Sequence, residues 1–167
     1  MRVLGIDPGL NGGIAVITKD NDTMSYIQAI KTPIFSLNKG SKSKRFLDAY
    51  SILKTIMDFD PDHAFIEKQQ PMPKQGVTST FVTGLGYGIY LGILVTRGIA
   101  YTEVHPTTWK KSFGLSSDKE EARKRASELM PTASELWKLK SDDGVAEAAL
   151  LAYYGMKSGS ATEKILH

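Results

Sequence analysis

Two short apolar runs in this sequence each end in a single carboxylate, and this repeated pattern restricts the folds open to the chain. Residues 3–6 lead into Asp7 and are followed by a Pro-Gly pair, and residues 64–66 lead into Glu67. Such runs are typical of strands buried in a sheet. A charge where a buried strand emerges is unfavourable unless a partner compensates it. Asp7 therefore either caps a tight turn or binds a cation, and Glu67 requires either a buried salt bridge or a cation.

The remaining patterns alternate between strands and helices, which indicates an α/β fold. Three early segments of strand character have short connections, and this arrangement predicts an antiparallel meander. Later apolar residues recur at helical spacing between further short strands. The strands are expected at residues 3–7, 14–18, 24–31, 64–67 and 99–105. Helices are expected at residues 46–59, 80–97 and 118–130, and a short helix or turn at residues 109–111. A last helix is expected to be capped near Asp142 and to end at Gly155.

Composition narrows the classes of function. The 167 residues suffice for one domain with a sizeable core, and the net charge of +3 permits a polyanionic partner. The absence of cysteine excludes disulfides, zinc-thiolate sites and a cysteine nucleophile. The chain starts directly with a strand, and its most apolar run, residues 85–95, is too short to span a bilayer. We therefore expect an intracellular protein with no membrane partner.

Two segments have unusual compositions. Residues 31–45 contain five basic residues and no acids, which predicts either a solvated loop or a mobile arm that contacts phosphates. The helix expected at residues 80–97 carries Gly84, Gly88 and Gly92 at a spacing of four, so these glycines form one bare stripe. The stripe either packs on the chain's own sheet, or lies at a subunit interface, or allows DNA to approach closely.

A third acidic segment lies in the last predicted helix. Asp143 and Glu147 are four residues apart and share one helix face, where they repel each other unless a positive group lies between them. The field at a helix N-terminus explains Asp142 or Asp143 but explains Glu147 poorly. If these acids meet Asp7 and Glu67, their oxygens suit Mg²⁺ or Mn²⁺. Two such ions can support in-line hydrolysis of a phosphodiester.

The three acidic segments resemble those of RuvC-type Holliday junction resolvases in the RNase H-like superfamily. The matching residues are Gly-Ile-Asp7-Pro-Gly, Phe-Ile-Glu67 and Asp-Asp143-Gly-Val-Ala-Glu147-Ala, and the resemblance extends over about residues 2–155. It is closest to phage-encoded members and to the plant chloroplast resolvase. It implies an α/β RNase H-like fold, with a five-stranded mixed sheet of three antiparallel strands and two added in parallel, flanked by helices. The nuclease domain would be residues 1–157, and residues 158–167 would form a flexible tail.

The resemblance also implies an activity. Members of the family are metal-dependent homodimers that make symmetric paired nicks in four-way DNA junctions, during recombination, repair or phage DNA processing. By matching position, Asp7, Glu67, Asp143 and Glu147 would hold two Mg²⁺ ions per active site, with Mn²⁺ as a substitute. Lys119 matches a lysine that assists the transition state. No nucleotide cofactor is expected, and the setting would be the cytoplasm of a bacterium or phage-infected host, or an organelle.

The same resemblance predicts a DNA-contacting surface. The loop at residues 69–76 and residues 84–87 match the part of the family that reads junction bases. Basic side chains in several other segments complete the predicted surface. The predicted DNA contacts are Lys68, Gln70, Lys74, Gln75, Gly84, Gly86, Tyr87, Lys110, Lys111, Arg123, Lys42, Lys44 and Arg45.

The sequence departs from the bacterial pattern in its last acidic segment, and other functions stay open. Bacterial members carry two Asp residues three apart, whereas the spacing here is four and the second acid is Glu, so either Asp142 or Asp143 is the ligand. A broader nuclease acting on forks and flaps, or a junction-binding protein without catalysis, would fit the same motifs. An actin-like sugar kinase fragment also shares Gly-Ile-Asp-x-Gly, but the chain lacks a second lobe at this length.

Overall fold

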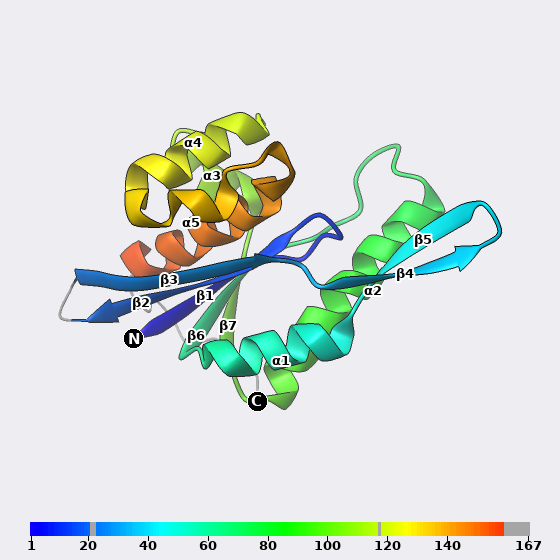
Figure 1. Ribbon diagram of the computed structural model, residues 1–167, viewed down its shortest axis with the longest axis horizontal. Helices are drawn as coiled ribbons and strands as arrows, with labels where there is room; N and C mark the ends of the chain where they lie inside the picture. The colour runs from blue at the N-terminus through cyan, green and yellow to red at the C-terminus, as the bar shows by residue number, and fades with distance from the viewer. Residues whose placement is uncertain (21–22, 117, 159–167) are drawn as a thin grey trace.

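The computed structural model describes residues 1–20, 23–116 and 118–158, without the side chains of Lys39, Lys42 and Lys119, and its centre is a five-stranded mixed sheet (Figure 1). The strand order is β3-β2-β1-β6-β7. Strands β1, β2 and β3 are antiparallel, while β6 and β7 run parallel to β1. The predicted sheet is therefore confirmed. Its strands are β1 (Arg2–Asp7), β2 (Gly13–Asp20), β3 (Thr23–Lys31), β6 (His63–Glu67) and β7 (Ala100–Val104).

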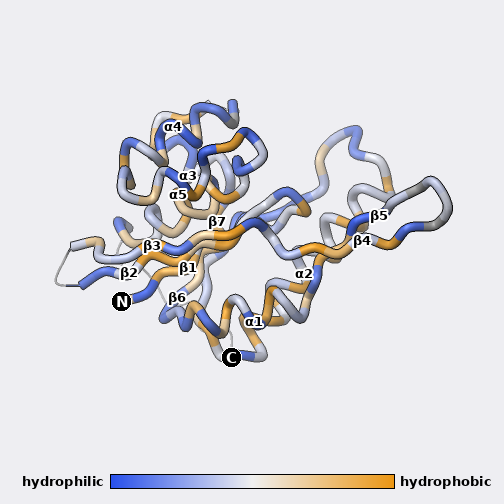
Figure 2. Tube along the Cα trace, viewed as in Figure 1, coloured by the Kyte–Doolittle hydropathy of each residue, from blue (hydrophilic) through white to orange (hydrophobic). Residues whose placement is uncertain are grey.

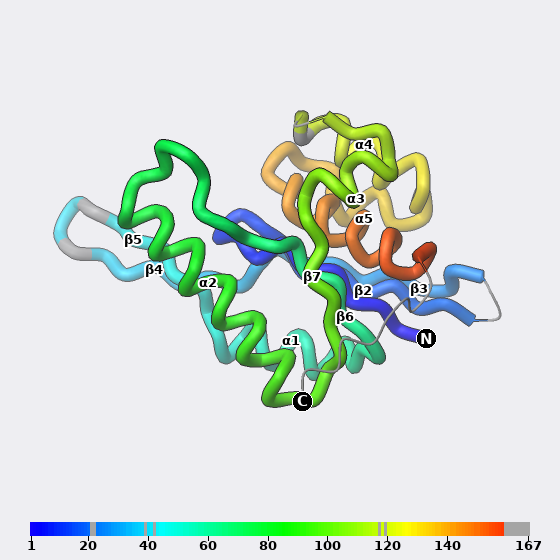
Figure 3. Tube along the Cα trace, turned by 180° about the vertical axis from the view of Figure 1, so that it is seen from behind, coloured from blue at the N-terminus to red at the C-terminus, as the bar shows by residue number. Residues whose placement is uncertain are grey.

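Helices cover both faces of this sheet (Figures 1 and 3). One face carries α1 and α2, and the other carries α3, α4 and α5 together with two short 3-10 helices. The central strands are mostly hydrophobic, as expected for a sheet covered on both sides, whereas α4 is mostly hydrophilic (Figure 2). The helices are α1 (Ala49–Phe59), α2 (Val77–Thr96), α3 (Pro106–Ser112), α4 (Lys119–Leu129), η1 (Pro131–Trp137), η2 (Lys140–Asp142) and α5 (Asp143–Ser158).

The alternation of side chains along β1 sets the direction in which Asp7 points. Leu4 and Ile6 are buried against α1 and α2, while Val3 is buried against α5 on the opposite face. Gly5 lies on that second face, where a Cβ atom would stand 2.0 Å from the Ala148 carbonyl oxygen. The glycine thus lets α5 lie directly on the sheet. Because successive residues of a strand alternate between faces, Asp7 follows Val3 and Gly5 toward α5.

The basic segment predicted as a loop or mobile arm is an ordered hairpin instead. Its strands, β4 (Ile34–Lys39) and β5 (Lys42–Leu47), form a separate antiparallel pair that extends away from the main sheet (Figure 1). Phe35 and Phe46 pair across the strands with their rings stacked at 5.4 Å. The strands are held together by this cross-strand aromatic pair rather than by any regular alternation, because β5 reads Lys-Ser-Lys-Arg-Phe-Leu.

Several predicted helix limits were wrong: α2 starts at Val77 rather than at residue 80, and the limits of α1 and α5 differ for local reasons. Helix α1 starts at Ala49 because the Asp48 carboxylate accepts a hydrogen bond from the Ser51 backbone N–H at 3.1 Å and caps the helix. Helix α5 continues through Gly155 to Ser158. Gly155 makes room for Phe65, whose ring would lie 2.2 Å from a Cβ atom at this position. The predicted tail falls almost entirely on residues 159–167, which lie outside the described part.

Helix α2 leaves one apolar face open. Val77 is 88% exposed and Phe81 is 69% exposed, and Leu85 and Val95 on the same face are also exposed. No atom lies within 4 Å of a Cβ atom built at Gly84, Gly88 or Gly92. The alternative in which the glycine stripe packs on the chain's own sheet is therefore wrong, because the stripe faces outward.

The apolar run is also longer than the sequence analysis assumed. By length and composition, the 20 residues of α2 could cross a membrane, with a mean hydropathy of 1.4, and only 17% of the helix window is buried. The apolar run predicted at residues 85–95 is extended by apolar residues in the first two turns of α2. A helix that packs against a protein partner can have the same length and the same apolar composition.

Candidate active site

The candidate site lies where β1 and β6 end beside the first turns of α5. Ile6 pairs with Ile66 in the parallel ladder, so Asp7 and Glu67 follow at the same edge of the sheet. Gly144 touches the turn between β1 and β2, since a Cβ atom there would stand 2.2 Å from the Asn11 carbonyl oxygen. This close approach brings the start of α5, and with it Glu147, to the edge that carries the two strand-end acids.

Glu67 is held by two donors. Its Oε2 accepts a hydrogen bond from Trp109 Nε1 at 2.9 Å, and its Oε1 accepts a longer bond from Gln69 Nε2 at 3.4 Å. Burial raises the pKa of the Glu67 carboxyl above its ordinary value, and the charge of Glu147 adds to the rise, while the bond from Trp109 opposes it. Glu67 and Glu147 are therefore close enough for their charges to interact.

Lys110 is the positive group that these acids share. Its Nζ donates to Glu147 Oε1 at 2.8 Å, and Glu147 is only 7% exposed. Burial lowers the pKa of Lys110, but the hydrogen bond and charge of Glu147, with additional attraction from Glu67 and Asp7, raise it overall. Three carboxylates from three elements thus act on one ammonium group. Lys110, predicted to contact DNA, lies inside the acidic site because α3 points it toward α5.

Asp143 and Asp142 have different partners. Arg123 Nε donates to Asp143 Oδ1 at 2.7 Å, and both side chains are largely buried. Arg123, also predicted to contact DNA, is therefore turned inward to an acid. Asp142 accepts from the Leu139 backbone N–H at 2.8 Å and pairs with Lys31 at 2.9 Å. These contacts make Asp142 a capping residue, and both acids form ion pairs, Asp142 with Lys31 and Asp143 with Arg123.

The predicted convergence of four carboxylates is present only in part. Within residues 1–20, 23–116 and 118–158, no three acidic or histidine side chains are arranged to hold a metal ion. Asp7, Glu67 and Glu147 interact with Lys110, whereas Asp143 pairs with Arg123. Bringing such acids together without a metal requires cationic partners, because like charges repel strongly at low dielectric. The donor set itself, carboxylate oxygens at one edge, suits a hard divalent cation.

The remaining predicted DNA contacts lie mostly on the surface. One of them is wrong: Gly86 is buried, and a Cβ atom there would stand 2.9 Å from Leu47 Cδ1, so the hairpin covers it. Tyr87 is half-buried and donates its hydroxyl to Glu103, and Gln75 bonds to Ser79 at 3.2 Å. The side chains of Lys42 and Lys119 lie outside the described part. The exposed members are Lys68, Gln70, Lys74, Gly84, Lys111, Lys44 and Arg45.

Trp109 is the functional residue that the sequence analysis missed. It is fully buried, and its indole N–H provides the shorter of the two hydrogen bonds to Glu67. Helix α3 is positioned by Pro106 at its start and by His105, whose Nδ1 accepts from the Thr107 backbone N–H at 3.4 Å. The only available signal was an aromatic residue beside Lys110 in a short polar helix. Such a signal does not identify the acceptor of the indole N–H.

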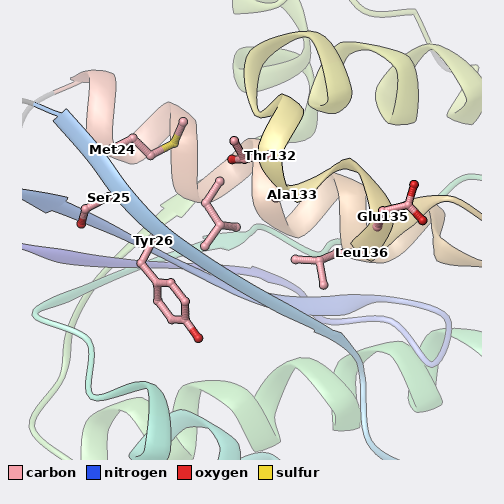
Figure 4. Close-up of a pocket in the computed structure, with 8 residues that line it drawn as sticks. Met24, Ser25, Tyr26, Thr132, Ala133, Glu135 and Leu136 are labelled. Carbon is pink, nitrogen blue, oxygen red and sulfur yellow. The ribbon is translucent and has the colours of Figure 1, made fainter.

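A pocket between β3 and η1 does not carry this chemistry (Figure 4). The single carboxylate in its lining belongs to Glu135, which pairs with Lys138 at 3.2 Å on the surface. Single surface pairs of this kind contribute little to stability or binding. The edge formed by β1, β6 and α5 is therefore the candidate active site.

Known proteins with similar sequences are RuvC proteins. No protein-family model matches the chain. A crossover junction endodeoxyribonuclease RuvC of Cereibacter sphaeroides is 33% identical over 114 residues, which span 67% of this chain and 65% of that relative. The RuvC of Herminiimonas arsenicoxydans is 41% identical over 71 residues, covering 41% of this chain and 37% of the relative. The matched stretch thus spans slightly less than two thirds of the Cereibacter protein.

Solved structures of resolvases share the fold. Thermus thermophilus RuvC in complex with a Holliday junction substrate has a TM-score of 0.62 at 18% identity, covering 98% of this chain and 99% of that chain. The fowlpox virus resolvase with junction DNA has a TM-score of 0.58 at 15% identity, covering 94% and 99%. At such identities the likeness concerns the fold. Taken together, the comparisons show that this chain is similar to RuvC proteins in sequence and shares their RNase H-like α/β fold.

Proposed function

We propose that this chain is a metal-dependent endonuclease that resolves Holliday junctions by symmetric paired nicks. The observation that carries the proposal is that Asp7 and Glu67 end neighbouring strands at the edge where Glu147 of α5 pairs with Lys110 at 2.8 Å. Relatives that match the sequence are named crossover junction endodeoxyribonucleases. The reaction would serve DNA recombination, repair or phage DNA processing inside a bacterial or infected host cell, or in an organelle.

We infer that this edge binds a pair of Mg²⁺ ions, with Mn²⁺ as a substitute, because carboxylate oxygens are the ligands that such cations prefer. Asp7, Glu67 and Glu147 would hold the ions in place of the Lys110 ammonium, and Asp143 would join them after release from Arg123. When bound, divalent ions would activate a water molecule and stabilise the leaving oxygen of the phosphodiester. Trp109 donates to the Glu67 carboxylate and would keep it oriented toward a bound ion, as hydrogen-bond donors to ligating groups do in metal sites. We expect Lys119 to neutralise charge in the transition state.

The open face of α2 supports a homodimer in which two such sites act on one junction. Val77, Phe81, Leu85 and Val95 form an apolar stripe with the three open glycines. Apolar patches of this kind are typical of protein interfaces, and glycines let two helices approach closely. A junction has two strands to cut symmetrically, so a two-fold pair of subunits matches the symmetry of the substrate.

Mapping cleavage on immobile and mobile four-way junctions tests the proposal. With Mg²⁺ we expect symmetric nicks in two opposing strands, and with EDTA we expect binding without nicks. The Asp7→Asn variant should bind junctions and cut none. Equal cutting of forks and flaps would favour the broader structure-selective nuclease, while binding without cutting under every metal would indicate a junction-binding protein.

A further inference from the structure

A pocket of about 380 Å³ lies beside the candidate active site, between the base of the β4–β5 hairpin and the start of α5. Three cationic side chains from three separate elements line it: Lys31 from the end of β3, Arg45 from β5 and Lys140 from η2. Asn11 adds an amide, and Asp143 connects the pocket to the acidic edge. The hairpin therefore brings a cation to a place that the main sheet alone would not supply.

Two of these cations are fixed by neutral or acidic neighbours. Arg45 Nη1 donates to Asn11 Oδ1 at 2.8 Å, which holds the guanidinium over the turn between β1 and β2. Lys31 Nζ donates to Ser141 Oγ at 2.9 Å and pairs with Asp142 at the same distance. Lys140 is exposed and forms no ion pair with any residue in the described part. Fixed cations lose less conformational freedom when they bind a ligand.

The charges around this pocket do not cancel. Asp142 offsets Lys31, and Arg123 offsets Asp143, so the charges of Arg45 and Lys140 remain uncompensated within the described residues. Gathering like charges in one hollow is unfavourable unless an anion fills it. Phosphate oxygens accept charge-assisted hydrogen bonds from such groups, and a guanidinium can donate two of them.

We propose that this pocket binds a phosphate of the DNA backbone, close to the nucleotide whose bond is cut at the acidic edge. The inference rests on the proposed function and adds a contact that positions the strand. Because a phosphate carries no base identity, the contact orients DNA of any sequence. Arg45 and Lys140 donate to the phosphate, while Lys31 stays paired with Asp142 and supplies a further positive charge.

Binding measurements with matched variants test the pocket. The variants are Arg45→Gln and Lys140→Gln, both at exposed positions, and the control is Lys54→Gln on α1, an exposed lysine on the opposite face of the sheet. Fluorescence anisotropy with a four-way junction in EDTA, repeated over a range of salt, gives the affinity and its salt dependence. We expect each pocket variant to bind about tenfold more weakly. The double variant should lower the salt slope by about 0.9, as for one lost phosphate contact.

A cross-linking experiment locates the phosphate. Since the chain contains no cysteine, Lys140→Cys introduces a single thiol. Junctions that carry one thiol-reactive tether on a chosen backbone phosphate are then tested position by position. We expect cross-links only at phosphates within a few nucleotides of the cut, and none at those positions with Lys54→Cys.

The outcomes separate the pocket from the proposed function. Unchanged affinity and salt slope in the double variant, or cross-links no better than those of Lys54→Cys, would overturn the pocket. A wild-type chain that neither cuts nor prefers junctions would overturn the proposed function instead. The affinity of the same variants for duplex DNA is then compared with that of the wild type. A weaker affinity supports a phosphate site in the pocket, and an unchanged affinity overturns it.

Discussion

The two faces of the sheet are covered in different ways, and the difference separates chemistry from assembly. On one face α5 lies directly on Gly5 and Gly13, and its first turns complete the acidic edge within a single chain. On the other face α2 buries Tyr90 and Leu94 but leaves a long apolar stripe open. The face covered by α5, here called the closed face, therefore carries the candidate active site. The face on which the apolar stripe of α2 stays exposed, here called the unfinished face, is available for a second subunit.

The largest expected effect concerns the closed face. Glu67→Gln should lower the rate of junction cleavage by about 10³-fold or more, because it removes one ligand from the acidic set. The control is Glu135→Gln in the pocket of Figure 4, which should cut like the wild type. The comparison uses rates of single-turnover cleavage. Equal rates for Glu67→Gln and the wild type would show that Glu67 is not part of the active site.

The same variant also predicts a change in stability. Burial raises the pKa of Glu67, so the folded state disfavours the ionised form and loses stability as the pH rises above the ordinary value of 4.5. In EDTA at neutral pH, Glu67→Gln should therefore unfold at the same temperature as wild type or higher. Thermal melts at pH 7 measure this, and a clearly lower melting temperature would contradict the assignment of Glu67 as a strained, functional acid.

The second effect contrasts one glycine from each face. Gly5→Ala should destabilise the protein by about 3 kcal/mol or more, because its Cβ atom would stand 2.0 Å from the Ala148 carbonyl oxygen. Gly88→Ala meets no atom within 4 Å and should stabilise the monomer by up to about 1 kcal/mol. Denaturant unfolding gives both free energies of unfolding. Similar values for the two variants would mean that the faces do not differ as described.

The third effect concerns the unfinished face. Phe81→Glu should weaken self-association by about 30-fold or more, because a charge would enter the apolar stripe. The matched control is Tyr26→Glu on β3, which also replaces an exposed aromatic residue but lies away from α2. Sedimentation over a range of concentrations measures the association. A wild-type chain that stays monomeric at all concentrations would show that the apolar stripe of α2 is not a dimer interface.

The smallest effect concerns Asp142. Burial would raise the pKa of this carboxyl, but hydrogen bonds from Lys31 and Leu139 and the charge of Lys31 lower it overall. A lowered pKa stabilises the fold at pH values above 3.8, the ordinary value, and this contribution disappears as the pH falls through the lower folded value. Asp142→Asn should therefore cost about 1 kcal/mol at neutral pH and little in strong acid. Unfolding curves at both pH values check the difference.

The sheet was predictable because each of its strands has a recognisable local sequence pattern. Apolar runs with short connections are sufficient to predict β1, β2 and β3, and the acids that end β1 and β6 follow from the same runs. The hairpin was not predicted, because β5 begins with four consecutive polar residues and its pairing with β4 becomes visible only in the structure. The partners of the acids were not predicted either, because Lys110 and Trp109 meet them from α3, over a large separation in sequence.

The orientation of α2 shows a second kind of limit. Its three glycines predict one bare stripe, but the direction of that stripe depends on which side of the helix faces the sheet. Apolar residues surround the helix on all sides, so the sequence contains no polar face that would indicate the solvent side. The choice between internal packing and an interface therefore required the structure.

Diffraction from crystals of the chain soaked in Mn²⁺ tests the central claim most directly, because anomalous scattering locates the metal. The account predicts metal peaks about 2.0–2.2 Å from carboxylate oxygens of Asp7 and Glu67, with Lys110 Nζ displaced from its position 2.8 Å from Glu147. A Lys110–Glu147 pair that persists in excess Mn²⁺, with no metal peak at this edge, would contradict it.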